Sequence, residues 1–400
     1  MRVLISGAGI AGPTLAYWLL RYGFEPTLVE EAPRLRTGGY IIDFWGLGFD
    51  IAEKMGIVPA LLRAGYFVED VKLVDAAGRR AGGFSAAVFK QATRGRYTSL
   101  PRSELAAELY RTIEGRVETI FGDRITEIVE GGGGARVKFE RSAPREFDLV
   151  VGADGLHSSV RRIMFGQSAR CETYLGYGVA AFELLGYRPR DELTYVSYSR
   201  PGKQAARFAM RDDWTLILLI FARDEVAGAR DEGARSGADI TAQRRELHRL
   251  FDHAGWECAS IMAAMDACDS IYFDRVSQIH LDSWSAGRCV LIGDAAACPS
   301  LLAGQGSALA MLGAYLLAGE LQRAKGDHLA AFAAYERRLR PFIEAKQKAA
   351  AQFASTFAPR TELGIFCRNL VTRAMRIPFV AELAIGRSLR DDLELPDYSA

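Results

Sequence analysis

The chain has 400 residues, of which 49% are hydrophobic and 25% are charged, an ordinary balance for a folded globular protein. Its 50 basic and 49 acidic side chains give a formal net charge of +1. No overall field therefore favours nucleic acid or an anionic membrane surface, and we expect neither as a partner. The longest uninterrupted apolar run, 216–222, is far shorter than the roughly 20 residues of a membrane helix.

The cysteines and histidines predict no metal chemistry. The six cysteines form no CxxC pair and the five histidines form no HExxH motif, so we expect no metal site and no dense disulfide framework. The chain runs from Met1-Arg2 straight into Val-Leu-Ile and a glycine turn without a cleavage site, so we expect no signal peptide. With reduced thiols, this pattern is typical of a cytoplasmic protein.

Apolar periodicity predicts alternating strands and helices, the pattern of an α/β protein. In the first 170 residues we expect strands at 2–6, 27–29, 71–74, 96–98, 124–129, 135–140 and 148–151, and helices from Pro13, within 38–65 and from Ser103 as N-cap. Beyond them we expect strands at 178–184, 193–199, 206–210, 215–221 and 289–293, and helices at 242–253, 304–324, 328–355 and in the last 45 residues. Pro341 should kink the helix at 328–355.

The first motif follows the first expected strand and reads Gly7-Ala8-Gly9-Ile10-Ala11-Gly12. Glycines in this pattern allow a tight turn and let the backbone approach a pyrophosphate at a helix N-terminus. Glu30 ends the next expected strand, where its carboxylate can accept hydrogen bonds from an adenosine ribose. The combination predicts a dinucleotide site and does not distinguish FAD from NAD. The alternative is a glycine-rich turn that only packs.

The second motif is the segment 148–155, which ends in Gly152-Ala153-Asp154-Gly155. A buried strand delivers an acid and a glycine to a turn, and Arg161 lies a short helical stretch beyond. By itself the motif is also compatible with an ordinary capped turn between a strand and a helix.

The third motif, 287–306, repeats this design with Gly293-Asp294 at the end of a strand. It continues through Pro299 to Gly304 and Gly306. An aspartate at this place can bind a ribityl hydroxyl, and the glycine-opened helix that follows directs its N–H groups toward a flavin ring or phosphate.

The order of these three motifs resembles that of the class A flavoprotein monooxygenases, the para-hydroxybenzoate hydroxylase fold family. Arg102, in the run Leu-Pro-Arg-Ser-Glu-Leu, is similar to the flavin-contacting arginine of that family. The resemblance implies that Glu30 holds the adenosine ribose, Asp294 the ribityl chain, and Asp154 the pyrophosphate and nicotinamide. Two departures concern the third motif. Ala297 stands where the family often has histidine, and Leu312-Gly313-Ala314 stands for its Glu-Asp-Ala.

The resemblance implies a Rossmann-like FAD-binding domain, an inserted β-sheet substrate domain and C-terminal helices. The expected boundaries are 1–67, 101–170 and 276–325 for the FAD-binding domain, 68–100 and 171–275 for the substrate domain, and 326–400 for the helical region. It also implies FAD as cofactor, NAD(P)H as transient electron donor, and O2-dependent hydroxylation of an aromatic or polycyclic small molecule through a flavin C4a-hydroperoxide. No side chain is identified as a catalytic acid or base.

The segment 38–43 looks most like that of the tetracycline-inactivating and polyketide-tailoring hydroxylases, which indicates secondary metabolism. It should bring Trp45 close to the flavin ring. On the expected strands of the substrate domain, alternation favours an inward direction for Phe182, Arg207, Met210 and Leu218. The alternatives are ordinary sheet packing for the apolar residues and a cross-strand salt bridge for Arg207. Aromatic walls are expected from Tyr195, Tyr198 and Trp214.

Four other functions remain open from the sequence. An isoprenoid-type flavin reductase shares the fold, and a non-catalytic flavin- or ligand-binding relative is compatible with Ala297. A flavin halogenase lacks its WxWxIP segment here, and the Gly293-Asp294 motif argues against a plain NAD-dependent dehydrogenase. The last apolar stretch carries Ile377, Phe379, Val380, Leu383 and Ile385. We expect it to brace the two domains rather than to bind a membrane.

Overall fold

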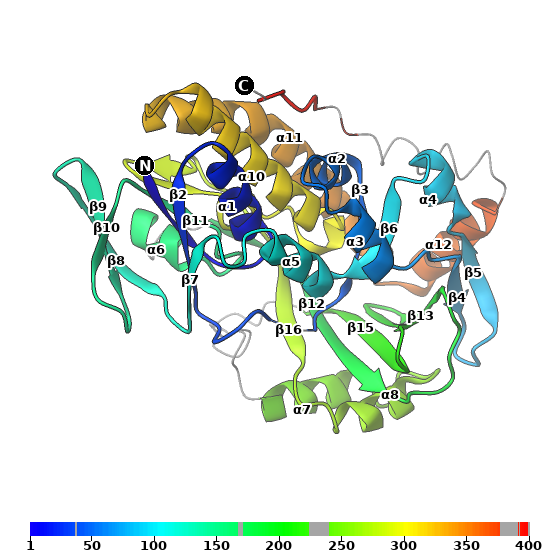
Figure 1. Ribbon diagram of the computed structural model, residues 1–400. Helices are drawn as coiled ribbons and strands as arrows, with labels where there is room; N and C mark the ends of the chain where they lie inside the picture. The colour runs from blue at the N-terminus through cyan, green and yellow to red at the C-terminus, as the bar shows by residue number, and fades with distance from the viewer. Residues whose placement is uncertain (37, 167–170, 224–239, 377–390, 392, 399–400) are drawn as a thin grey trace.

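Two β-sheets of different design carry the fold (Figure 1). The computed structural model describes residues 1–36, 38–166, 171–223, 240–376, 391 and 393–398. The first sheet has six strands in the order β17-β18-β11-β1-β2-β7. Their bounds are β1 (Arg2–Ser6), β2 (Glu25–Glu30), β7 (Glu118–Phe121), β11 (Leu149–Gly152), β17 (Ser285–Ala286) and β18 (Cys289–Leu291). The expected α/β class is confirmed.

The centre of the six-stranded sheet is parallel, since β1 pairs in parallel with both β2 and β11, and β11 with β18. All three motifs follow the carboxyl ends of these central strands. In an open parallel sheet, ligands bind outside those ends, so the sheet topology brings three distant segments of sequence to one edge. The helix α1 (Ala11–Arg21) links β1 to β2, and α10 (Gly306–Arg323) packs against α1.

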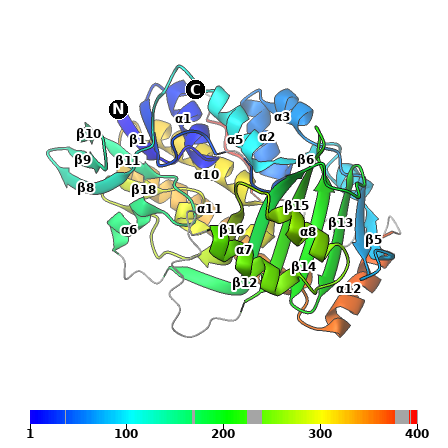
Figure 2. The same ribbon diagram turned by 90° about the horizontal axis from the view of Figure 1, so that it is seen from below.

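The second sheet has seven strands in the order β16-β12-β15-β14-β13-β4-β5. Their bounds are β4 (Asp70–Val74), β5 (Arg80–Ser85), β12 (Glu172–Leu185), β13 (Thr194–Arg200), β14 (Lys203–Ala209), β15 (Trp214–Ala222) and β16 (Tyr272–Ile279). Two helices, α7 (Ile240–Phe251) and α8 (Cys258–Met265), cover one face, as Figure 2 shows from below. The opposite face turns toward the first sheet and its helices.

A two-stranded sheet of β3 (Ile41–Trp45) and β6 (Tyr97–Pro101) lies against the seven-stranded sheet and α10. It carries aromatic and polar side chains toward the seven-stranded sheet, and Tyr66 beside it packs edge-on against Phe208 of β14 at 5.3 Å between ring centroids. Short helices surround this sheet: α2 (Gly46–Lys54), α3 (Val58–Ala64), α4 (Ala87–Ala92) and α5 (Arg102–Arg111).

The remaining elements are peripheral or follow the motifs. A three-stranded antiparallel sheet holds β8 (Ile125–Gly131), β9 (Gly134–Phe139) and β10 (Arg145–Phe147). The helices are α6 (Ser159–Phe165), α9 (Asp294–Ala297), α11 (His328–Phe357) and α12 (Glu362–Ala374), with a 3-10 turn at Leu301–Ala303. None of the helices within the described ranges is both long and apolar enough to cross a membrane.

Several local expectations were wrong. The helix expected within 38–65 is a strand and two short helices, and α4 and α8 were not expected. The Ser103 side chain does not cap α5, which begins one residue earlier after Pro101. Proline at the N-cap position leaves the turn without a side-chain acceptor. The helix expected at 328–355 is confirmed as α11, which contains Pro341, and the kink at this proline stays a prediction. The apolar stretch 377–385 lies outside the described residues.

Candidate cofactor and substrate site

The glycine-rich loop is packed so tightly that side chains are excluded. A Cβ on Gly12 would lie 1.9 Å from the carbonyl oxygen of Gly7. Gly7 itself has φ +106°, and a Cβ there would lie 2.5 Å from the carbonyl oxygen of Ala153. The loop therefore turns directly against the strand end that carries the second motif, which only glycine allows.

Glu30 is tied to this loop. Its Oε2 accepts the N–H of Ala8 at 2.8 Å and its Oε1 accepts the N–H of Ala32 at 3.0 Å. Arg36 approaches to 3.8 Å. Each carboxylate oxygen retains a second lone pair, so the group remains able to accept a hydrogen bond from a hydroxyl at the sheet edge.

Asp154 caps the helix that follows it. Its carboxylate accepts hydrogen bonds from the Ser158 hydroxyl at 2.5 Å and from the N–H groups of Ser159 and Val160 at 2.8 and 3.1 Å. Burial raises the pKa of this carboxyl, and these hydrogen bonds oppose the shift. The contacts within the chain are thus those of the capped turn between strand and helix.

Arg161 links the second motif to the third. It is 7% exposed, and its guanidinium donates to the carbonyl oxygens of Ala295 at 3.0 Å and Leu156 at 2.5 Å. Sequence reasoning noted its position without giving it a role. No local pattern signals this contact, because Ala295 lies 134 residues further along the chain.

Arg102 and Asp294 lie beside the glycine loop. A Cβ on Gly9 would lie 3.7 Å from Nη2 of Arg102. Burial raises the pKa of the Asp294 carboxyl, and the positive charge of Arg102 lowers it in part. Among the described residues the Arg102 guanidinium has no hydrogen-bond or ion-pair partner, although the backbone N–H of Arg102 donates to Tyr40. A cation without a partner beside a buried carboxylate is typical of a ligand site.

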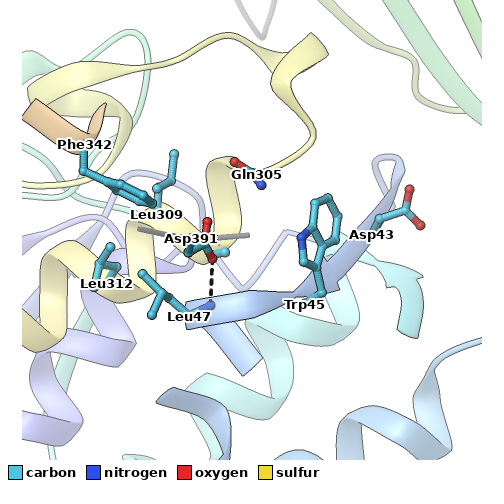
Figure 3. A pocket seen from close by; sticks show the side chains of 9 residues that line it. Asp43, Trp45, Leu47, Gln305, Leu309, Leu312, Phe342 and Asp391 are labelled. Atoms are coloured by element: carbon cyan, nitrogen blue, oxygen red, sulfur yellow. Dashed lines mark hydrogen bonds between the residues drawn. The ribbon is translucent and has the colours of Figure 1, made fainter. Parts of the chain in front are cut away.

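A small cavity of about 10 Å³ lies beside the loop of the third motif (Figure 3). One wall is apolar and comes from Leu309 and Leu312 of α10 and Phe342 of α11. Trp45 of β3 stands opposite, and the polar lining groups are Asp43, Gln305 and Asp391. Gln305 lies between Gly304 and Gly306, so the cavity adjoins the loop of the third motif.

Comparison with known proteins agrees with this geometry. The model of the FAD binding domain family matches residues 1–346. A flavin-dependent monooxygenase from an unknown prokaryotic organism is 32% identical over 408 residues, covering 100% of this chain and 99% of its own length. The chain belongs to the class A FAD-dependent monooxygenases. The crystal structure of tetracycline destructase Tet(51) matches with a TM-score of 0.83 and 31% identity, over 100% of this chain and 99% of that one.

Membership in the class A monooxygenases confirms FAD as the cofactor and oxidoreduction as the type of reaction. A more distant structure, HpxO of Klebsiella pneumoniae complexed with FAD and uric acid, is 21% identical with a TM-score of 0.78. It covers 97% of this chain and 95% of its own, and shares the fold.

The side chains fit FAD. The free guanidinium of Arg102 offers donors, and the carboxylates of Asp294 and Glu30 offer acceptors for hydroxyl groups. Gly304 has φ +66° and no atom within 4 Å of the place where a Cβ would stand, which leaves room for a ligand against the backbone. Pro299 lies in the same loop, and its carbonyl oxygen accepts a hydrogen bond from Gln278 at 3.0 Å.

Two of the five expected substrate contacts lie on the helix-covered face of the seven-stranded sheet, not on the expected inward face. Phe182 is 3% exposed and packs in the cluster with Leu247 and Phe251 of α7. Arg207 is 3% exposed and pairs with Asp191 at 2.6 Å and Glu257 at 2.9 Å. Both side chains belong to the face of the sheet that α7 and α8 cover, so the salt-bridge alternative describes Arg207.

Met210 and Leu218 are on the other face, but neither lines the described cavity. Met210 packs with Tyr66 and Phe208, and Leu218 packs with Val179. Of the five, only Trp45 lines the cavity. Among the expected aromatic walls, Tyr198 lies on the helix-covered face and Trp214 is 38% exposed.

A second group of polar residues near the cofactor loop was not expected. The rings of Tyr40 and Tyr272 lie 5.5 Å apart between centroids. Burial raises the pKa of Tyr40 to about 12. Asp274 of β16 is 8% exposed and pairs with His157, at 3.1 Å from Nε2. This pair joins the turn of the second motif to the seven-stranded sheet, a contact between segments more than 100 residues apart.

Proposed function

We propose that this monooxygenase hydroxylates an aromatic or polycyclic small molecule, with O2 as oxidant and NADH or NADPH as electron donor. The observation that carries the proposal is the convergence of the three motifs at one edge of the parallel sheet, in a chain that matches a flavin-dependent monooxygenase over its full length. Trp45, Leu309 and Phe342 beside the loop Gly304-Gln305-Gly306 offer aromatic and apolar contacts of the kind that suit aromatic ligands. The name of tetracycline destructase Tet(51) supports a polycyclic substrate as one member of this class.

We assign the cofactor contacts to the three motifs, which converge at one sheet edge. The proposed set is Gly7, Gly9, Ile10, Ala11, Gly12, Glu30, Arg102, Asp154, Gly293, Asp294, Pro299, Gly304 and Gly306. Within it, Glu30 holds the adenosine ribose and Asp294 holds the ribityl chain. Arg102 contacts the flavin. Asp154 acts mainly by holding the turn, because both of its oxygens accept hydrogen bonds within the chain.

Bound FAD, once reduced, supplies the activation of O2. The chain contributes binding, orientation and exclusion of water. Leu309, Leu312 and Phe342 make the cavity wall apolar, which keeps water away from the reacting atoms. Trp45 offers a flat surface on which an aromatic substrate can stack.

The domain boundaries remain part of the proposal. All six strands of the first sheet fall within 1–67, 101–170 and 276–325. The boundary at residue 275 lies inside β16 (Tyr272–Ile279), so the strand belongs to both proposed domains. We also propose a cytoplasmic location, which the free cysteines support.

The test is the visible spectrum of the purified protein, before and after anaerobic NAD(P)H and then air. We expect a bound-flavin spectrum that bleaches with NAD(P)H and returns with air, and aromatic compounds that accelerate the bleaching. Oxygen uptake matched by a product that is 16 mass units heavier identifies hydroxylation. Saturation of a substrate double bond without oxygen uptake would instead identify a reductase, and a protein that binds no FAD would contradict the proposal.

A further inference from the structure

The loop of the third motif contains a residue in a strained conformation. Ser300 has φ +107°, a region that residues other than glycine rarely adopt, and it is 2% exposed. It lies between Pro299, a proposed FAD contact, and the 3-10 turn Leu301–Ala303 that leads to Gly304. Backbone strain of this kind persists only where surrounding contacts hold the chain in place, and it is common at functional sites. The strained backbone therefore needs support from outside the loop.

Two buried glutamine side chains hold the backbone just before Ser300. Nε2 of Gln278, on β16, donates to the carbonyl oxygen of Pro299 at 3.0 Å. Nε2 of Gln347, on α11, donates to the carbonyl oxygen of Cys298 at 3.1 Å. Both side chains are 4% exposed. Two consecutive carbonyl groups are thus held from two elements that lie outside the loop.

The two glutamines, here called the glutamine clamp, are also bound to one another. Nε2 of Gln278 donates its second hydrogen to the carbonyl oxygen of Gln347 at 2.8 Å, and Nε2 of Gln347 donates its second hydrogen to that of Ile279 at 2.7 Å. Nε2 of His280 lies 3.2 Å from Oε1 of Gln278, which favours the orientation that turns the amide nitrogen toward the loop. An apolar side chain of equal length could fill either place but could donate to none of these carbonyl groups.

The packing around the clamp places the loop at the cofactor edge. The helix α11 packs against α10 and against the 3-10 turn, and β16 contacts the same turn from the seven-stranded sheet (Figure 1). The N–H of Ile279 adds a hydrogen bond to the carbonyl oxygen of Cys298 at 3.1 Å. Burial raises the pKa of the Asp294 carboxyl, and Arg102 and then hydrogen bonding by the Cys298 side chain lower it in part. A residue that the clamp holds therefore lies beside the carboxylate assigned to the ribityl chain.

We propose that Gln278 and Gln347 are positioning residues of the FAD site, which hold the loop 299–306 in the strained conformation that brings it against the cofactor. Without the clamp, Ser300 can relax to a negative φ, and the loop after it then changes its course. The inference rests on the proposed function, since it takes this loop to contact FAD.

The decisive variant is Gln347→Met, which keeps the length of the side chain and removes both donors. We expect FAD to bind at least about tenfold more weakly, as measured by the quenching of its fluorescence. At saturating FAD, the absorbance maxima and the reduction potential of the bound flavin should shift, because the loop is proposed to lie against it. A role in stability alone would move neither quantity.

Gln243→Met is the matched control. Gln243 is 6% exposed on α7, which covers the far face of the seven-stranded sheet. The same substitution there removes a buried amide without touching the loop. It should change neither the FAD affinity nor the spectrum and potential of the bound flavin.

A double-mutant cycle with Ser300→Gly tests the role of the strain. Glycine adopts φ +107° without strain, so a loop with glycine at this position needs less support from the clamp. In the wild-type background we expect Ser300→Gly to change the FAD affinity by less than about twofold, whereas in Gln347→Met it should recover at least about threefold of the lost affinity. If Gln347 acted only through global stability, the two substitutions would combine additively.

Three results would overturn the proposal: an unchanged FAD affinity in Gln347→Met, an unchanged spectrum and potential of its bound flavin, or additive effects in the cycle with Ser300→Gly. If Gln347→Met does not fold, Gln278→Met decides by the same measurements, since it removes the donor to the next carbonyl group. The proposed function fails separately. If the variants lose FAD as expected but the wild type hydroxylates no aromatic compound, the clamp retains its role while the hydroxylase proposal is wrong.

Discussion

The guanidinium of Arg161 donates a hydrogen bond across 134 residues of sequence to the carbonyl oxygen of Ala295, at 3.0 Å. This contact joins the turn after β11 to the turn after β18, and so aligns two of the three cofactor motifs. The same guanidinium binds the carbonyl oxygen of Leu156. A buried cation that satisfies two carbonyl groups is a fixed connection between adjacent strand ends.

Arg161→Ala should weaken this connection. It leaves two carbonyl groups without their donor, and we expect the free energy of unfolding to fall by about 1–3 kcal/mol. FAD affinity should fall as well, because both turns lie at the edge of the sheet where FAD is proposed to bind. Urea unfolding and flavin retention measure the two effects. The control is Arg162→Ala at the exposed neighbouring position. Equal losses in both variants would contradict the role of Arg161.

Asp294→Ala should lose cofactor and activity together. The carboxylate is held beside Arg102 by the third motif, where it can accept a hydrogen bond from a hydroxyl group of the ribityl chain. We expect the purified variant to contain less than about a tenth of the wild-type flavin, since a charge-assisted hydrogen bond contributes about 1.5–3 kcal/mol. The absorbance ratio of flavin to protein gives the result. A variant with full FAD content would remove Asp294 from the site.

Gly12→Ala should prevent the glycine loop from closing. A Cβ at this position would lie 1.9 Å from the carbonyl oxygen of Gly7, and backbone cannot move aside cheaply. We expect FAD to bind at least about tenfold more weakly, an effect of about 1.4 kcal/mol or more. A titration of FAD with protein, followed by the quenching of FAD fluorescence, measures the affinity.

Gly131→Ala is the matched control for the loop. No atom lies within 4 Å of a Cβ built there, and its backbone does not adopt a left-handed φ. Its FAD affinity should equal that of the wild type. If Gly12→Ala also binds FAD normally, the pyrophosphate does not lie against this loop.

His248 makes the free energy of unfolding depend on pH. Hydrogen bonds to Asp266 and then Asp252, at 3.0 and 2.8 Å from its ring nitrogens, raise its pKa above the usual 6.5. A raised folded pKa means that the stabilisation is complete below pH 6.5 and is lost as the pH rises through the folded value. The side chain is 30% exposed, so we expect its contribution to the free energy of unfolding to be less than about 1 kcal/mol.

The measurement is urea unfolding from pH 5.5 to 8.5 for the wild type and His248→Gln. The difference in free energy of unfolding between the two proteins should be largest at low pH and shrink as the pH rises. Since the other titrating groups are common to both proteins, they cancel in this difference. A constant difference across the range, or one that grows with pH, would show that His248 is not stabilised as a cation.

Much of the cofactor site could be predicted from the sequence, because its motifs are local. A glycine that permits a left-handed turn and an acid that ends a strand are visible in a few consecutive residues, as in the loop 7–12 and at Gly293-Asp294. The parallel order of the strands then follows from alternating strands and helices, and parallel strands bring their carboxyl ends to one edge. The sequence therefore determined the fold class and the sheet edge at which a dinucleotide binds, and its resemblance to the class A flavoprotein monooxygenases implied FAD and the kind of reaction.

Only the tertiary structure decided the substrate side. Alternation along β12 and β14 shows that neighbouring residues face opposite ways, but not which face α7 and α8 cover. Phe182 and Arg207 were therefore placed on the wrong side. The contact of Gln347 with Cys298 was likewise not visible, since it joins segments 49 residues apart. Local patterns encode turns and periodicity, whereas cavities and buried partners arise from packing between distant segments.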